Sequence, residues 1–308
     1  MLAILLFVAI IIVYTLFISR STTIGKFIYH LSMASEQKSA KLTTLSVSVN
    51  GVTVYYYTNE TADNSKPVLL LVHGFSGDKT IWHRFAKHAQ KDFTLIIPDL
   101  LGHGDTPYSP QQSYSSLEQS KMLMSLLDDL GISKYSVIGN SMGGMISMQL
   151  LQADHKRIDK CVLLDPAGAA SQFAVDVYND KFNPFEHYEF STFETFYKAS
   201  MVNPPFMPRC VLQFIAYEYY ITRREQLTHM FGDFFNIEEF FKQQQLADSK
   251  QLLIIWGNDD GLLPFSDAEY WQSITGIQPI IYNGIGHMPM LECPKRTYED
   301  CHAFIMRS

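Results

Sequence analysis

A serine in a glycine-rich turn is the first residue whose setting suggests chemistry. Residues 139–143 read G-N-S-M-G, a G-x-S-x-G pattern between an apolar run, Tyr135 to Ile138, and a helix-like run, Met142 to Gln152. A sharp turn between strand and helix lifts a serine oxygen out of a sheet, and the glycines leave room for close backbone approach. The pattern therefore predicts that Ser141 is a nucleophile.

A serine hydroxyl needs a general base at neutral pH. His287 is the predicted base, because it lies in the loop between the last apolar run and the final helix-like run. The imidazole needs an acid to orient it, which should follow a strand that lies between the serine and the histidine. Asp259 and Asp260 both follow the apolar run 251–256, and either could be that acid.

Acyl transfer also needs two N–H donors for the developing oxyanion. The backbone N–H of Met142, directly after the serine, is one predicted donor. The second should come from the loop 73–77, H-G-F-S-G, which follows the apolar run 67–72. We predict the N–H of Phe75, and such a donor contributes about 3 kcal/mol to the transition state.

The sequence does not indicate a metal or a cofactor. Residues 99–105 read D-L-L-G-H-G-D, but no second cluster of ligands accompanies this alternation of histidine and aspartate. Gly102 and Gly104 suit a tight loop instead. We therefore predict no metal, and we expect His73 and His103 to be structural hydrogen-bonding residues rather than bases.

The elements that must position these residues form an α/β pattern. Short apolar runs alternate with helical periodicity, which predicts a mostly parallel sheet with helices on both faces in residues 42–170 and 250–308. Asn50-Gly51 predicts an antiparallel hairpin at one edge. Residues 171–249 lose the alternation, contain several prolines and hold nearly half of the aromatic residues. We predict an inserted helical cap there.

The N-terminus has the composition of a membrane segment. Residues 1–18 contain no charged side chain and are nearly long enough to cross a hydrocarbon core of about 30 Å. We predict an uncleaved anchor over residues 1–19; a cleaved signal peptide and a buried helix are the alternatives, although the start lacks the basic residues typical of signals. Basic residues after the segment favour a cytoplasmic catalytic domain.

Residues 20–41 are predicted to form an amphipathic helix. Ile24, Phe27, Ile28 and Leu31 follow the spacing of one helical face. This face either lies in the membrane interface or packs on the domain, and the sequence does not separate the two.

Composition limits the classes of partner. The chain has 308 residues and a formal charge of −7, so it lacks the basic excess of a nucleic-acid-binding protein. Its 47% of hydrophobic residues can fill a sizeable core. The four cysteines are far apart and indicate neither a zinc site nor a disulfide scaffold, although a single pair is not excluded. The oligomeric state is not predicted.

Taken together, these segments resemble the α/β-hydrolase family over about residues 45–305. The segments that carry the resemblance are HGFSGDKTIW at 73–82, PDLLGHGDT at 98–106, GNSMGG at 139–144, WGNDDGLLP at 256–264 and GHMPMLECP at 286–294. Relatives commonly read G-x-x-D-x-x-x-P around the acid. By this resemblance, Gly257 and Pro264 make Asp260 the acid of a Ser-His-Asp set.

Within the family, the chain is most similar to membrane-anchored monoacylglycerol lipases and related bacterial lipases. The resemblance implies a serine hydrolase that cleaves acyl esters of lipids, with an apolar ester and a membrane as partners. Other Ser-His-Asp chemistry, such as C–C bond, thioester or amide hydrolysis, is the alternative. A membrane-tethered binding protein without activity is a remote one, because Ser141, Asp260 and His287 are all present.

Overall fold

The computed structural model describes residues 21–59, 66–180, 183–242 and 251–307. Within these ranges, no helix is both long enough and apolar enough to cross a membrane. The predicted anchor, residues 1–19, lies outside the described residues. Its membrane role therefore stays a prediction.

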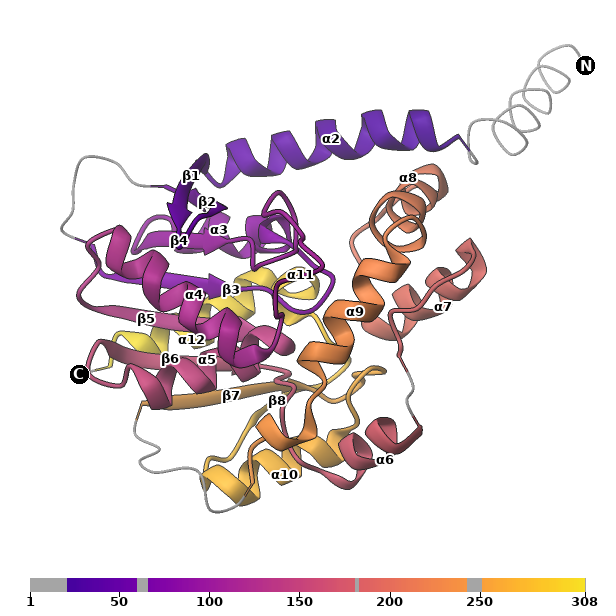
Figure 1. Ribbon diagram of the computed structural model, residues 1–308. Helices are drawn as coiled ribbons and strands as arrows, with labels where there is room; N and C mark the ends of the chain where they lie inside the picture. The colour runs from indigo at the N-terminus through magenta and orange to yellow at the C-terminus, as the bar shows by residue number, and fades with distance from the viewer. Residues whose placement is uncertain (1–20, 60–65, 181–182, 243–250, 308) are drawn as a thin grey trace, which may run out of the picture.

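One eight-stranded sheet forms the centre of the molecule, in the order β1-β2-β4-β3-β5-β6-β7-β8 (Figure 1). The pairs β1–β2 and β2–β4 are antiparallel, and all other neighbours are parallel. The strands are β1 (Thr43–Val49), β2 (Val52–Thr58), β3 (Val68–Val72), β4 (Thr94–Pro98), β5 (Tyr135–Asn140), β6 (Ile158–Leu164), β7 (Leu252–Gly257) and β8 (Ile280–Tyr282). The predicted α/β-hydrolase fold, with its hairpin at one edge, is confirmed.

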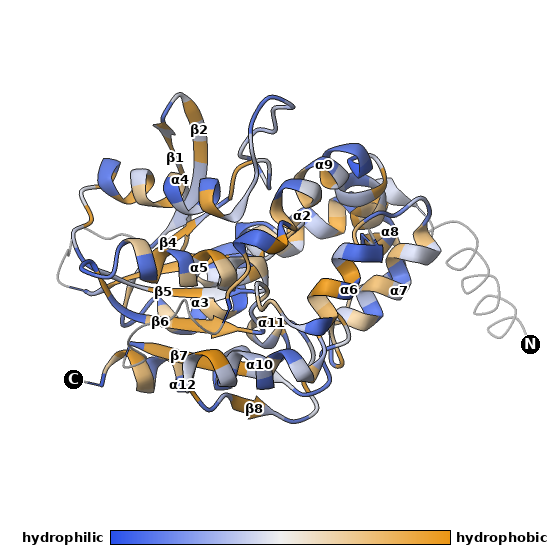
Figure 2. Ribbon diagram, turned by 60° about the horizontal axis from the view of Figure 1, so that its bottom comes forward, coloured by the Kyte–Doolittle hydropathy of each residue, from blue (hydrophilic) through white to orange (hydrophobic). Residues whose placement is uncertain are grey.

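Helices cover both faces of this sheet, as predicted. In β3, Leu70 and Val72 join the core beneath α4 (Ser116–Asp129) and α5 (Met142–Ala153). Leu69 and Leu71 join the core beneath α3 (His83–Ala89) and α12 (Pro294–Ile305). All four side chains are fully buried, which explains the continuous apolar runs of the central strands (Figure 2). These helices are η2 (Lys79–Trp82), α3 (His83–Ala89), α4 (Ser116–Asp129), α5 (Met142–Ala153), α10 (Phe265–Thr275), α11 (Pro289–Glu292) and α12 (Pro294–Ile305).

The described parts of the segment between β6 and β7 are mainly helical. Its elements are α6 (Gln172–Asp180), α7 (Phe190–Ser200), α8 (Arg209–Ile215), the π-helical segment η3 (Ala216–Ile221), α9 (Arg224–Phe234) and η4 (Ile237–Glu239). Figure 1 shows α7, α8 and α9 at one side of the sheet. We call these elements the inserted helices; whether they act as a separate cap stays a prediction.

The N-terminal helix α2 (Thr22–Ser39) packs against α8 (Figure 1). The contact is so close that a Cβ atom on Gly25 would lie 2.0 Å from the carbonyl oxygen of Cys210. The helix therefore packs on the domain, which is one of the two expected arrangements. Phe27 and Leu31 remain 70% and 62% exposed on its outer side, so contact of that side with a membrane stays a prediction.

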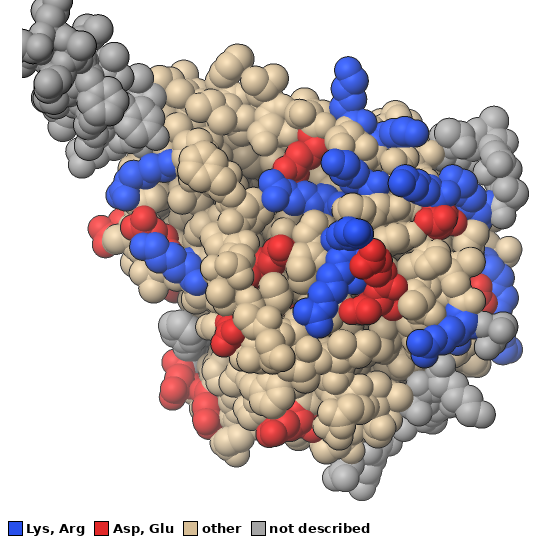
Figure 3. Space-filling view, turned by 180° about the vertical axis from the view of Figure 1, so that it is seen from behind, with Lys and Arg blue, Asp and Glu red and all other residues tan. Residues whose placement is uncertain are grey.

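The remaining expectations concern charge and cysteines. Acidic and basic side chains are interspersed on the face seen in Figure 3. All four cysteines are free, and three of them are buried. The fold therefore rests on its packed core and not on a disulfide.

Candidate active site

Ser141 occupies a sharp turn between β5 and α5. Its backbone angles are φ 56° and ψ −121°, a conformation that a residue with a side chain rarely adopts. A Cβ atom on Gly139 would lie 2.0 Å from the carbonyl oxygen of Gly143, and one on Gly143 would lie 2.3 Å from that of Val72. The glycines therefore allow the turn, as the sequence pattern predicts.

Asp260 and His287 are joined by a hydrogen bond. The distance from His287 Nδ1 to Asp260 Oδ2 is 2.6 Å, and the Asp260 side chain is 1% exposed. The other oxygen, Oδ1, accepts the N–H groups of Leu262 and Leu263 at 2.7 and 3.0 Å. Asp259 is exposed to solvent. Of the two candidate acids, the structure brings Asp260 to His287.

Ser141 and His287 line the same cavity. The side chain of Asn140 ties their backbones together, because its Nδ2 donates to the carbonyl oxygens of His287 at 2.9 Å and of Leu164 at 3.1 Å. No hydrogen bond joins the hydroxyl of Ser141 to His287, both of which the structure describes. Such contacts often tighten only when substrate binds.

The loop 73–77 lies directly over the serine. A Cβ atom on Gly74 would lie 3.1 Å from the Cβ of Ser141, and Phe75 lines the same cavity. Met142 begins α5, so its N–H is at a helix N-terminus. The two predicted oxyanion donors are therefore on the elements that flank Ser141, and their role stays a prediction.

His73 and His103 make buried hydrogen bonds with the backbone. Nε2 of His73 accepts the N–H of Leu100 at 3.0 Å, so Nδ1 carries the proton and donates to the carbonyl of Gly74 at 2.8 Å. Burial lowers the pKa of His73 to about 4, so the ring is neutral at pH 7. Nδ1 of His103 contacts the carbonyl of Leu101 at 2.9 Å. Both rings support the loops, as expected.

The cavity beside Ser141 has a volume of about 250 Å³ and a mainly apolar lining. The inserted helices and the segment before α7 contribute an apolar wall. Its residues are Phe185, Phe193, Phe196, Tyr197, Val211 and Ile215. The helix α2 supplies another wall with Ile28, Tyr29, Ser32, Met33 and Glu36. The sequence did not reveal this contribution of α2, because helical periodicity identifies a face but not the surface that it meets.

Asp165 is a second carboxyl group near the pair that sequence reasoning missed. It follows β6, is completely buried and has φ +44°. Its Oδ1 accepts the N–H of Gly257 at 2.7 Å, whereas its Oδ2 has no partner among the described residues. Oxygens of Asp165 and Asp260 and a ring nitrogen of His287 lie within 4.8 Å of one another. Burial, and then the charge of Asp260, raises the pKa of Asp165 well above its ordinary value.

Several known proteins are similar to this chain in sequence. A family described by the alpha/beta hydrolase fold matches residues 67–294. Lipase 3 of Moraxella sp. (strain TA144) is 31% identical over 245 residues, which cover 77% of this chain and 76% of that protein. A monoacylglycerol lipase, abhd6-B, of Xenopus laevis is 24% identical over 269 residues, which cover 79% and 76%.

A similar fold occurs in the crystal structure of a membrane phospholipase A, described as a bacterial virulence factor. The TM-score is 0.82 at 23% identity, and the match covers 99% of this chain and 96% of that one. This likeness concerns the fold. The chain is thus homologous to bacterial lipases and, more distantly, to monoacylglycerol lipases.

Proposed function

The chain belongs to the α/β-hydrolase family, and from this premise we propose that it is a lipase or esterase that cleaves a monoacylglycerol or a similar acyl ester through an acyl-enzyme. One observation carries the proposal. Ser141, at its strained turn, and His287, bonded to Asp260, share a mainly apolar cavity. A nucleophile, a base and an apolar binding space are the parts that hydrolysis of an acyl ester requires.

In the proposed reaction, Ser141 attacks the ester carbonyl while His287 takes the hydroxyl proton. Asp260 holds the imidazole and stabilises its positive charge. The N–H groups of Phe75 and Met142 bind the oxyanion. The imidazolium then protonates the leaving alcohol, and an acyl-serine remains. Water, deprotonated by His287, attacks this ester, and the fatty acid leaves with regeneration of Ser141.

Chain-length dependence of ester hydrolysis tests the substrate class. Each buried methylene contributes about 0.8 kcal/mol, so kcat/KM for p-nitrophenyl esters should rise by up to about fourfold per methylene until the cavity is filled. The full-length protein in detergent would be assayed with acyl chains of increasing length and with monoacylglycerols. A rate that falls steadily from the acetyl ester upward would contradict a lipid substrate.

The role of Ser141 can be tested separately with a fluorophosphonate probe. The wild-type protein should be labelled, Ser141→Ala should not, and Ser273→Ala should behave as wild type, because Ser273 is an exposed serine on α10. Labelling of Ser141→Ala at the wild-type rate would place the nucleophile elsewhere.

We further propose that residues 1–18 hold the enzyme in a membrane. The support is the uncharged run itself, together with the exposed Phe27 and Leu31 on the helix that follows it. Full-length protein should stay in the membrane pellet after washing with carbonate or high salt. Release by either wash would contradict the anchor, and a mature N-terminus beyond residue 18 would favour a cleaved signal.

A further inference from the structure

We infer that one end of the cavity is a head-group site that accepts an uncharged, hydroxyl-bearing alcohol and rejects anionic head groups, with Asp78 as the residue that makes the distinction. This inference rests on the proposed ester hydrolysis and specifies its substrate class. The polar lining residues that define this end are Tyr29, Glu36, Asp78, Thr80, Arg84 and Tyr219. We call it the acidic end of the cavity.

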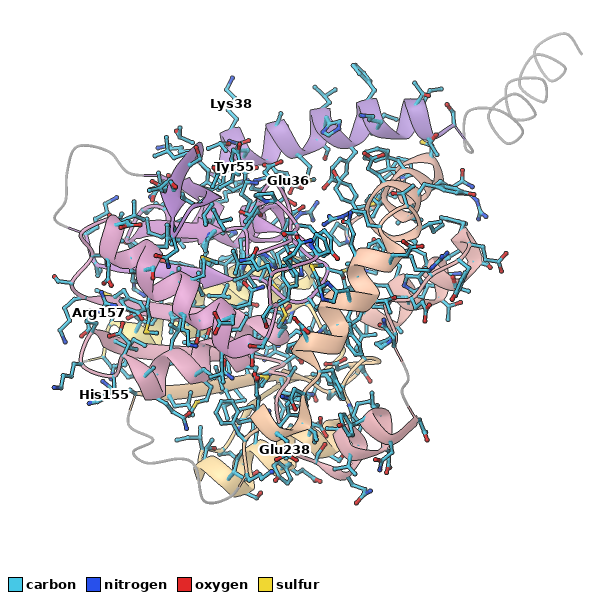
Figure 4. The ribbon with its side chains drawn as sticks, in the orientation of Figure 1. Glu36, Lys38, Tyr55, His155, Arg157 and Glu238 are labelled. Atoms are coloured by element: carbon cyan, nitrogen blue, oxygen red, sulfur yellow. The ribbon has the colours of Figure 1, made fainter. Side chains whose placement is uncertain are left out.

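The acidic end is assembled from three separate parts of the chain. Helix α2 supplies Tyr29 and Glu36, the segment 78–84 with η2 and the start of α3 supplies Asp78, Thr80 and Arg84, and η3 supplies Tyr219. The rings of Tyr29 and Tyr219 lie 5.9 Å apart. In Figure 4, Glu36 lies on the side of α2 that faces the body of the molecule, whereas Lys38 points away from it.

The acidic end lies close to the reacting carbonyl. The N–H of Gly77 bonds to the carbonyl of Gly74 at 3.3 Å, so the chain turns back between Phe75 and Asp78. Even a fully extended chain would separate those two Cα atoms by at most about 11 Å. An alcohol that leaves the oxyanion loop can therefore reach Asp78, while its acyl chain occupies the apolar wall.

Charge decides which alcohol fits. Glu36 and Arg84 neutralise each other, because Nε and Nη2 of Arg84 both donate to Glu36 Oε1, at 3.0 and 2.8 Å. Asp78 forms no ion pair with any described residue, so the charge of the acidic end is negative. A phosphate or carboxylate placed there would meet an unpaired carboxylate in a half-buried setting, which is unfavourable.

One carboxylate oxygen of Asp78 is also available as a hydrogen-bond acceptor. Its Oδ1 accepts the N–H and the hydroxyl of Thr80 and so caps η2, whereas its Oδ2 accepts no hydrogen bond from any part of the chain that the structure describes. Burial, with a smaller contribution from Asp78, raises the pKa of Tyr29 and that of Tyr219, so both phenols remain protonated. A glycerol hydroxyl can donate to Oδ2 and contact these phenols.

Two esters with the same acyl chain test the inference. They are 1-monoacylglycerol and its 3-phosphate, presented to the full-length protein in the same neutral detergent. Wild type should cleave the monoacylglycerol with the higher kcat/KM. A charge pair about 7 Å apart at an effective dielectric of about 20 changes rates by more than tenfold, and solvent screening reduces this. Asp78→Asn should therefore raise kcat/KM for the phosphate ester about tenfold relative to the monoacylglycerol.

Asparagine can still accept the N–H of Thr80, so Asp78→Asn should fold. Asp78→Ser, which also caps a helix, is a second variant, and Asp129→Asn, which removes an exposed charge at the end of α4, should leave the ratio unchanged. An unchanged ratio in both Asp78 variants, or a wild-type preference for the phosphate ester, would overturn the inference. If wild type cleaves neither ester and is not labelled by fluorophosphonate, the proposed function fails instead.

Discussion

Asp165→Asn should stabilise the protein, and the gain should grow as pH rises from about 4 toward the raised pKa of Asp165. An unfolded aspartate has a pKa of about 3.9, whereas burial and the charge of Asp260 hold the pKa of Asp165 far higher in the folded protein. Above pH 4 to 5, the unfolded chain has therefore released a proton that the folded protein still binds. Folding stability must fall as pH rises through this range.

The magnitude follows from this one proton. A difference of one bound proton changes the free energy of unfolding by about 1.4 kcal/mol per pH unit, so wild type should lose up to about that much per pH unit through Asp165 between the unfolded pKa and the raised folded pKa. Asparagine does not titrate, keeps an oxygen for the N–H of Gly257 and tolerates the positive φ of +44°. The stability difference between Asp165→Asn and wild type should thus increase by the same amount.

Urea unfolding of the two proteins at pH 5, 6 and 7 measures this difference. Trp256 and Trp271 are fully buried and report unfolding by fluorescence. Other acids with raised pKa values, such as Asp99 and Asp267, cancel in the comparison because both proteins contain them. Unfolding free energies that keep a constant difference over this range would refute a pKa of Asp165 raised well above its ordinary value.

Three further predictions concern the reaction and the N-terminal segment. Ser141→Ala should lower kcat about 10⁴-fold or more in a p-nitrophenyl ester assay while circular dichroism is unchanged, and a tenth of wild-type turnover would exclude its role. Asp260→Asn should cost on the order of 10⁴ in kcat, whereas the exposed Asp259 should tolerate the same change; the reverse ranking would move the acid. Removal of residues 1–20 should leave kcat/KM for soluble esters within about twofold, because these residues precede α2, whereas removal of residues 1–30 should reduce it at least about tenfold with the loss of Tyr29. Equal activities of the two truncated proteins would show that α2 does not shape the cavity.

The proximity of Ser141, Asp260 and His287 could be predicted because each residue follows a strand of a parallel sheet. The carboxyl ends of such strands meet at one edge, so a short apolar run before each residue is enough to bring the three together. The choice of Asp260 over Asp259 required the motif spacing of relatives, because Asp259 also follows β7 closely in the sequence. What separates the two is burial, which the structure supplies: the Asp260 side chain is 1% exposed, and Asp259 lies in solvent.

The contribution of α2 to the cavity wall could not be predicted in the same way. Ile24, Phe27, Ile28 and Leu31 share one helical face by spacing, yet Phe27 and Leu31 face outward while Ile28 lines the cavity. The reason is a contact between distant parts of the chain, the tight packing of Gly25 on α8. No periodicity in residues 22–39 encodes the position of α8.

Helix α2 follows the proposed anchor in the chain and also forms part of the proposed head-group site. Its inner side supplies Tyr29 and Glu36 to the cavity, and its outer side presents Phe27 and Leu31 directly after the uncharged N-terminal run. An anchor that enters a bilayer just before Thr22 would hold that outer side near the lipid surface. The acidic end would then lie one helix diameter, about 10 Å, from the lipid.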